Sequence, residues 1–244
     1  MSYNYDEICQ IYDDVREADF EIVKFMVDKA GITKESHVLE VGCGTGNYLK
    51  LVHNMTKSKI WGVDQSLGIL SKAREKCCDG KFIQDDASEL LNLPNSTFSL
   101  VFMVDVIHHI KDIDKTFESI KRILKDNGTL IVFSDSHEHI RNRLTSKYFP
   151  ETLAPELKRY PDTSQLTNSL LSNEFRSVEN GILELGQDQN YGAKLIDIAT
   201  KRGYSMFGLI SHDEIQKGVD RIKQDMLMHP VVYQQRACYV LGKK

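Results

Sequence analysis

The stretch from His37 to Tyr48 constrains this chain more than any other, because three glycines follow a short apolar run. Val38–Val41 has the length and branching of a β-strand, and the apolar spacing after Asn47 is that of a helix. Glycines let the backbone approach a ligand, and the free N–H groups of a helix start attract electron-rich atoms. The stretch therefore predicts a ligand site at the end of the first strand.

The spacing of the glycines and the acid before them narrow the type of ligand. Asn47 stands where the dinucleotide fingerprint G-x-G-x-x-G has its third glycine. The glycines alone are also compatible with an ordinary tight turn. With Glu40 the segment reads E-V-G-C-G-T-G, which resembles motif I of the class I S-adenosylmethionine-dependent methyltransferases. The resemblance implies that the glycine backbone accommodates the cofactor's carboxylate end and that Glu40 receives its ammonium group.

Acidic residues also close the next two expected strands, Lys59–Asp64 and Lys81–Gln84. Asp64 would lie at the tip of the strand beside the first, where a carboxylate can accept hydrogen bonds from both ribose hydroxyls. The resemblance places Asp86 and Ala87 beside the adenine, although the adjacent Asp85 leaves open which acid contacts the base. The alternatives are a helix N-cap for Asp64 and turn roles for the other two acids.

The resemblance implies a full set of cofactor contacts, including a tyrosine from an N-terminal segment that closes over the site. That expected set is Tyr12, Glu40, Gly42, Cys43, Gly44, Gly46, Asn47, Asp64, Gln65, Asp85, Asp86, Ala87, Met103 and Val104.

The candidates for acceptor chemistry follow the fourth expected strand, Phe98–Val104. There V-I-H-H-I resembles the V-L-H-H-I segment of the small-molecule branch of the superfamily. A histidine suits proton abstraction near neutral pH, so His108 and His109 are the catalytic candidates, with His137, His139 and Tyr191 also considered as a base. Packed or capping histidines are the alternative. The expected substrate-binding residues are His137, Arg159, Tyr160 and Tyr191.

Alternating strand and helix patterns predict an α/β fold, a doubly wound, seven-stranded, mostly parallel sheet. We expect a single domain over 1–244, with a helical segment at 1–30. A helical cap over the active site is expected from 137–173 and 186–228. Finer expectations are a helix over 112–125, a turn at 126–128 and a strand over 129–133. The resemblance places a last strand, 231–241, antiparallel at the sheet edge.

Composition limits the possible partners. The net charge of −4 and the lack of a strong basic cluster disfavour a nucleic-acid binder. Five cysteines without a C-x-x-C pair indicate reduced thiols and no metal site. The polar N-terminus is not a signal peptide, and no apolar run is long enough to span a membrane. We therefore expect a cytoplasmic monomer or homodimer.

These features predict a methyltransferase that uses S-adenosyl-L-methionine to methylate a small molecule, without a metal. Two alternatives stay open. A nicotinamide-dependent oxidoreductase is disfavoured by Asn47 and Glu40. A non-catalytic regulatory protein that binds the same cofactor would be favoured by a cap that leaves no cavity beside the methyl group.

Overall fold

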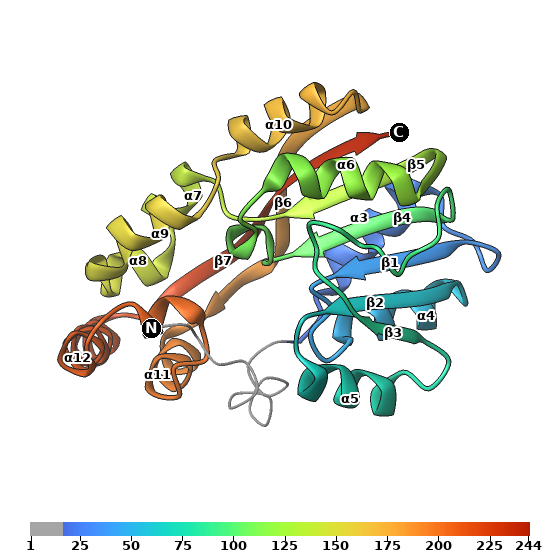
Figure 1. Cartoon of the computed structure of the whole chain (residues 1–244). Helices are drawn as coiled ribbons and strands as arrows, with labels where there is room; N and C mark the ends of the chain where they lie inside the picture. Colours follow the sequence, from blue (N-terminus) through green and yellow to red (C-terminus); the bar gives the residue numbers. More distant parts are fainter. Residues whose placement is uncertain (1–16) are drawn as a thin grey trace.

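The computed structural model describes residues 17–244, so Tyr12 lies outside the described residues. One sheet of seven strands has the order β3-β2-β1-β4-β5-β7-β6, and all its pairings are parallel except those of β7. The predicted doubly wound fold is therefore confirmed (Figure 1). The strands are β1 (His37–Val41), β2 (Lys59–Asp64), β3 (Lys81–Gln84), β4 (Phe98–Val104), β5 (Leu124–Phe133), β6 (Arg176–Asn190) and β7 (Val232–Lys243).

The helices alternate with the first five strands and then gather after β5. Before and between these strands lie α3 (Phe20–Ala30), α4 (Asn47–Thr56), α5 (Leu67–Lys76), η1 (Ile107–His109) and α6 (Ile113–Ile123). After β5 come α7 (His137–Asn142), α8 (Leu144–Tyr148), η2 (Pro150–Thr152), α9 (Leu153–Arg159), α10 (Thr163–Ser172), α11 (Gly192–Thr200), η3 (Ser205–Gly208) and α12 (His212–Met228).

The apolar run of β4 explains why helices cover both faces of the sheet. Leu100 and Phe102 point to the core shared with α3, α4 and α5, whereas Val101 and Met103 point to the core shared with α6 and α10. All four side chains are fully buried. Successive side chains of a strand face opposite sides, so a strand buried on both faces must be apolar throughout.

A third apolar cluster holds the helices beyond the carboxyl ends of the parallel strands. It contains Phe149 and Phe207, whose rings meet edge to face with centroids 4.9 Å apart, together with side chains of α8, α11 and α12. In Figure 1 these helices, with α7 and α9, lie to the left of the arrowheads of β1, β4 and β5. The group of α7, α8, η2, α9, α11, η3 and α12 is called the cap below.

The structure corrects three of the finer expectations. The last strand is antiparallel but does not lie at the edge, because β7 pairs with β5 on one side and β6 on the other. The expected turn at 126–128 is an irregularity within β5, whose pairing with β4 jumps from Leu124 to Thr129. The helix before it ends at Ile123 rather than 125.

The cap is also narrower than the stretches 137–173 and 186–228. Helix α10 packs against α6 through Leu166, Leu170 and Phe117, so it covers the sheet. Residues 186–190 extend β6 instead of starting a helix. Helix α10 has apolar partners on the sheet, and Gln189 and Asn190 pair with Tyr233 and Val232 of β7, so both segments are placed by neighbours distant in sequence.

The N-terminal segment is described from Glu17 onward. The Asp19 carboxylate caps α3 by accepting hydrogen bonds from the backbone N–H groups of Glu21 and Ile22, and Gly31 ends the helix in the left-handed conformation, as expected.

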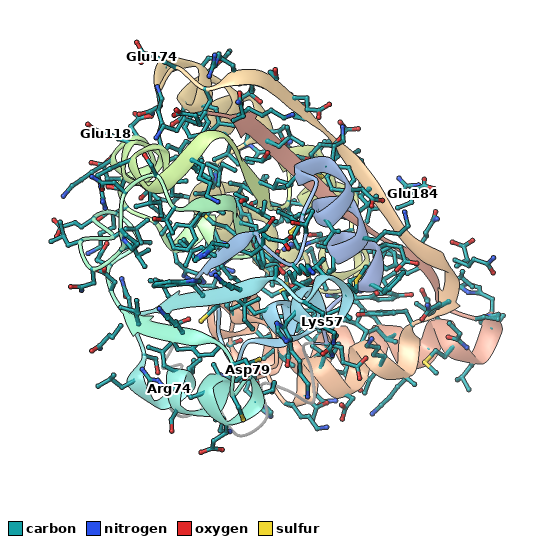
Figure 2. The ribbon with its side chains drawn as sticks, turned by 90° about the vertical axis from the view of Figure 1, so that its right-hand side faces the viewer. Lys57, Arg74, Asp79, Glu118, Glu174 and Glu184 are labelled. Atoms are coloured by element: carbon teal, nitrogen blue, oxygen red, sulfur yellow. The ribbon has the colours of Figure 1, made fainter. Side chains whose placement is uncertain are left out.

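The outer surface carries charged side chains, as Figure 2 shows for Glu118, Glu174 and Glu184, which are all exposed. Among residues 17–244, no helix combines the length and apolar character needed to cross a bilayer.

Candidate functional site

The turn after β1 needs glycine for both conformation and space. Gly42, Gly44 and Gly46 all have positive φ, at 74°, 51° and 80°. A Cβ on Gly42 would also lie 2.5 Å from the side chain of Val106. Gly46 is the N-cap of α4 and provides no side-chain acceptor to the first turn of that helix.

The tip of β2 is tied to this turn. Asp64 accepts a hydrogen bond from the backbone N–H of Gly44 (3.1 Å) through Oδ2 and another from the Ser66 N–H (3.0 Å) through Oδ1. The backbone N–H groups of Gly42 and Cys43 both donate to the carbonyl of Val63, at 2.7 and 2.9 Å. The acid predicted to bind the ribose therefore lies beside the glycine turn.

Glu40 is buried at the carboxyl end of β1, with 3% of its surface exposed. Its carboxyl group hydrogen-bonds the backbone of Leu49, yet Oε2 has no hydrogen-bond partner among the described residues. Burial, and secondly the nearby charge of Asp64, raise the pKa of Glu40 well above its ordinary value. A buried acceptor of this kind fits a cationic group, such as the ammonium of the cofactor's methionine part.

A cavity of about 560 Å³ lies between the glycine turn and the cap. Of the predicted site residues, its wall includes Glu40, Gly42, Cys43, Asn47, Val104, Arg159, Tyr160 and Tyr191. The structure therefore brings together the methionine end of the expected cofactor site and three of the four expected substrate residues.

The residues expected around the ribose and adenine lie outside this cavity, next to one another. Gln65 Nε2 donates to Asp86 Oδ2 at 3.3 Å, and Asp86 Oδ1 accepts from the backbone N–H and hydroxyl of Ser88. Those Ser88 hydrogen bonds lower the pKa of Asp86. Asp85 accepts the backbone N–H groups of Asp86 and Asn92, both at 2.9 Å, and so shapes the loop.

Three further residues expected to contact the cofactor differ in which of their groups can face it. The side chain of Met103 is fully buried in the core on the α6 side, so only its backbone can face a ligand. Val104 lines the cavity. Ala87 is buried against the same core as Met103.

The histidines expected to act on the acceptor lie behind the cavity wall. His108 is stacked on Tyr160, with ring centroids 4.1 Å apart and planes at 16°, and its ring is also close to that of His109. His137 Nε2 donates to the carbonyl of Tyr160 at 2.8 Å. Neither His108, His109 nor His137 is among the described residues that line the cavity. Their contacts instead fix the ring and backbone of Tyr160.

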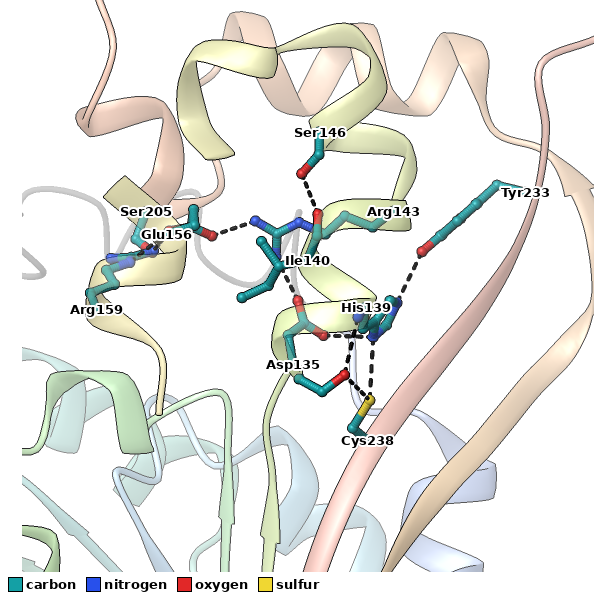
Figure 3. A network of polar contacts seen from close by, with 11 residues as sticks. Asp135, His139, Ile140, Arg143, Ser146, Glu156, Arg159, Ser205, Tyr233 and Cys238 are labelled. Atoms are coloured by element: carbon teal, nitrogen blue, oxygen red, sulfur yellow. Dashed lines mark hydrogen bonds and ion pairs between the residues drawn. The ribbon is translucent and has the colours of Figure 1, made fainter. Parts of the chain in front are cut away.

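A chain of five charged side chains forms the cap side of the wall, as Figure 3 shows. His139 Nδ1 lies 3.0 Å from Asp135 Oδ1, and the other oxygen of Asp135 contacts Arg143. Arg143 also pairs with the buried Glu156, which in turn accepts from Arg159 Nε at 2.6 Å. Of these five, sequence reasoning selected only Arg159 and His139, because the pairs join helices without a shared motif.

The charges in this chain stabilise one another. Burial lowers the pKa of His139, but the Asp135 carboxylate outweighs burial and raises it to about 10. Burial raises the pKa of Asp135, but His139 and Arg143 lower it below its ordinary value. His139 Nε2 lies 3.3 Å from the hydroxyl of Tyr233, whose pKa burial raises to about 12. At neutral pH, His139 is therefore a cation and Tyr233 a neutral phenol.

A family model described as a methyltransferase domain matches residues 39–132. An uncharacterized methyltransferase of Geobacillus sp. is 33% identical over 139 residues, which cover 54% of this chain and 62% of that protein. The demethylmenaquinone methyltransferase of Tropheryma whipplei is 32% identical over 111 residues, covering 44% of this chain and 45% of the relative. The chain thus spans less than two thirds of the length of these relatives.

Solved structures share the fold at low identity. A protein of Anabaena variabilis, provisionally assigned as a methyltransferase of an antibiotic biosynthesis pathway, superposes with a TM-score of 0.79 at 20% identity, covering 93% of this chain and 98% of that one. A phosphoethanolamine N-methyltransferase of Haemonchus contortus, solved with S-adenosylhomocysteine, gives 0.64 at 18% identity, covering 98% and 57%. These findings show that residues 39–132 form a methyltransferase domain of the class I S-adenosylmethionine-dependent type, in the type 11 branch, and that the rest of the chain shares the fold of such enzymes.

Proposed function

We propose that this protein transfers a methyl group from S-adenosylmethionine to a small-molecule acceptor in the cavity between the sheet and the cap. The observation that carries the proposal is the buried Glu40, whose unpartnered Oε2 lies at a cavity wall beside a turn with three left-handed glycines. A carboxylate acceptor beside a glycine turn and a helix start suits a ligand that presents an ammonium and a carboxylate together.

The residues fit the parts of that cofactor in order. Glu40 would receive the ammonium, the backbone near Gly44 the carboxylate, Asp64 the ribose hydroxyls, and Asp86 with Ala87 the adenine. Bound there, the cofactor supplies a methyl group already activated on a sulfonium. Besides these contacts, the protein has to align the acceptor and exclude water, which the buried walls of the cap favour.

The cavity supports a small acceptor. Its volume of about 560 Å³ lies within the range typical of small-molecule sites. The demethylmenaquinone methyltransferase among the relatives is also named for a small-molecule acceptor. The proposed partner is therefore a metabolite rather than a nucleic acid or a membrane, and a cytoplasmic monomer or homodimer stays a prediction.

The sequence predicted His108 and His109 as catalytic residues, but neither is among the described residues that line the cavity. His108 stacks on Tyr160 and His109 lies beside His108, so we propose that His108 positions that ring and His109 supports His108. His139 lines the cavity but is a cation at neutral pH, which makes it a binding group rather than a base.

The cavity and Glu40 also disfavour the two alternative functions, a non-catalytic cofactor-binding protein and a nicotinamide-dependent enzyme. A non-catalytic cofactor-binding protein would be favoured by a cap that leaves no space beside the methyl group, and a cavity of about 560 Å³ runs from the glycine turn to the cap. A nicotinamide enzyme would not need Glu40 at the position where its buried carboxyl faces the turn.

The test is calorimetric titration of the purified protein with S-adenosylhomocysteine and, separately, with NAD. We expect binding of the adenosyl compound and none of NAD. The second step is incubation with methyl-labelled S-adenosylmethionine and a metabolite panel, with S-adenosylhomocysteine formation as readout. Binding of NAD without binding of the adenosyl compound would overturn the proposal.

A further inference from the structure

The charged residues around the cavity separate into two ends. The end beside the glycine turn carries the acids Glu17, Asp19 and Glu40, and no lysine or arginine among the described wall residues there. Asp105 lies between the two ends, where its charge acts on both Tyr48 and Tyr160. The cap end carries Arg143, Arg159, Lys194, Arg236 and His139 against two acids, Asp135 and Glu156. The acidic end suits a cofactor with a sulfonium and an ammonium, so the basic end is left for another ligand.

The buried part of the basic end is unbalanced by one positive charge. In the chain His139–Asp135–Arg143–Glu156–Arg159 the signs alternate and both ends are cations. Glu156 is fully buried and Arg143 nearly so, which keeps the charges poorly screened by water. A series of three cations and two anions carries one net positive charge, which one further anion would balance.

Buried donors without partners lie at the same wall. Arg143 Nε and the hydroxyls of Thr145 and Ser134 have no hydrogen-bond partner among the described residues. Their residues are 8%, 8% and 7% exposed and all line the cavity. Burying a hydrogen-bond donor without a partner costs folding free energy, and most buried donors in native proteins have one. Three donors beside an excess positive charge match the acceptor atoms of an oxyanion.

We propose that the methyl acceptor carries an anionic oxygen group, a carboxylate or a phosphate, held at the cap end by Arg143 Nε–H and the hydroxyl of Thr145. The atom that accepts the methyl group then lies on the opposite side of the acceptor, toward Glu40. The role of this subsite in catalysis rests on the proposed function, but its binding of anions does not.

The rival explanation is that the ion chain only fastens the cap. Arg143 and Glu156 join α7–α8 to α9, and Arg159 Nη2 donates to Ser205 of η3 at 2.7 Å. A purely structural chain would not discriminate an anion from a neutral molecule of the same shape, and it would not respond to the loss of the Thr145 hydroxyl.

The test uses benzoate, inorganic phosphate and neutral benzamide as probes at constant ionic strength. Each is titrated into the ¹⁵N-labelled protein, alone and saturated with S-adenosylhomocysteine, while the arginine Nε–H resonances are followed by NMR. We expect benzoate or phosphate to shift the Arg143 signal and to bind about ten-fold more tightly than benzamide. Thr145→Val should weaken anion binding several-fold.

Two controls keep the result decisive. Thr200→Val removes an exposed hydroxyl of α11 that bonds only within its helix, and it should leave anion binding unchanged. If Thr145→Val does not fold, Ser134→Ala tests the second open hydroxyl. Equal binding of benzoate, phosphate and benzamide, or undiminished anion binding in the hydroxyl variant, overturns the proposal. Failure to bind S-adenosylhomocysteine would instead refute the proposed function while leaving the anion result readable.

Discussion

The carboxylate of Asp64 accepts a hydrogen bond of 3.1 Å from the backbone N–H of Gly44, which fastens the end of β2 to the turn that follows β1. Asp64 ends β2 and Gly44 lies in the turn after the neighbouring parallel strand β1, so the bond lies at the carboxyl edge of the sheet. In open sheets of this type, ligands bind at that edge. One side chain therefore shapes the turn and, in our proposal, holds the ribose.

Replacing Asp64 by asparagine tests this double role. The amide can still accept from Gly44, so we expect the fold to persist. The neutral group holds the ribose hydroxyls more weakly, and affinity for S-adenosylhomocysteine should fall about 10- to 100-fold. Calorimetry measures the affinity, with the exposed Asp79→Asn as the matched control. Unaltered affinity in the Asp64 variant would contradict the ribose assignment.

Cofactor binding should release a proton from Glu40. Its raised pKa favours the neutral carboxyl in the free protein, and a bound ammonium favours the charged form, so binding lowers that pKa. The heat of binding near pH 7 should then depend on the ionisation enthalpy of the buffer. Glu40→Gln should abolish that dependence and weaken binding at least ten-fold, whereas the exposed Glu184→Gln should change neither. Identical heats in phosphate and Tris with the unmodified protein would refute this coupling.

Gly42→Ala and Gly31→Ala separate backbone strain from crowding. Both glycines have positive φ, but only at Gly42 would the new Cβ collide with Val106; at Gly31 nothing lies within 4 Å. We expect a loss of about 1 kcal/mol in unfolding free energy for Gly31→Ala and about 2–4 kcal/mol for Gly42→Ala. Urea denaturation measures both. The added variant Val106→Ala should recover part of the larger loss, and equal losses at the two glycines would count against the close contact.

The pairing of His139 with Asp135 should appear in the pH dependence of stability. The folded-state pKa of His139, about 10, exceeds the ordinary 6.5, so its protonation stabilises the fold fully below about pH 6.5 and that contribution disappears as pH rises toward 10. Asp135→Asn should lower the pKa of His139 and flatten this dependence. The nearby Cys238 thiol has a pKa below its ordinary value, because its contacts with His139 and Ser136 together outweigh burial.

The His139 ring resonances should therefore be followed directly by NMR, together with urea unfolding at several pH values between 6 and 10. Titration of His139 near 6.5 in the unmodified protein would show that the ion pair does not hold in solution. The depressed pKa of Asp135 acts below its ordinary 3.8 and lies outside this window.

Local sequence signals predicted the parallel part of the sheet closely. The expected limits of β2, β3 and β4 agree with the structure residue for residue. Each contains a short apolar run that a polar residue ends or follows, and this pattern depends on neighbours a few positions away. The left-handed glycines after β1 were likewise readable, since few other residues adopt that conformation.

The placement of residues whose partners are distant in the sequence was harder to predict. His108 and His109 follow β4 as expected, but His108 stacks on Tyr160 and neither histidine lines the cavity. The position of β7 inside the sheet depends on pairing with both β5 and β6. No local pattern distinguishes an edge strand from an inner one when both alternate.

The sequence by itself determined the glycine turn, the carboxylates at 40 and 64 and the strand–helix alternation, because backbone conformation and apolar periodicity are encoded within a few residues. Only the tertiary structure decided that Asp135, His139, Arg143, Glu156 and Arg159 form one chain of charges at the cavity. The physical reason is that ion pairs between helices form only after the apolar cap cluster has brought those helices together.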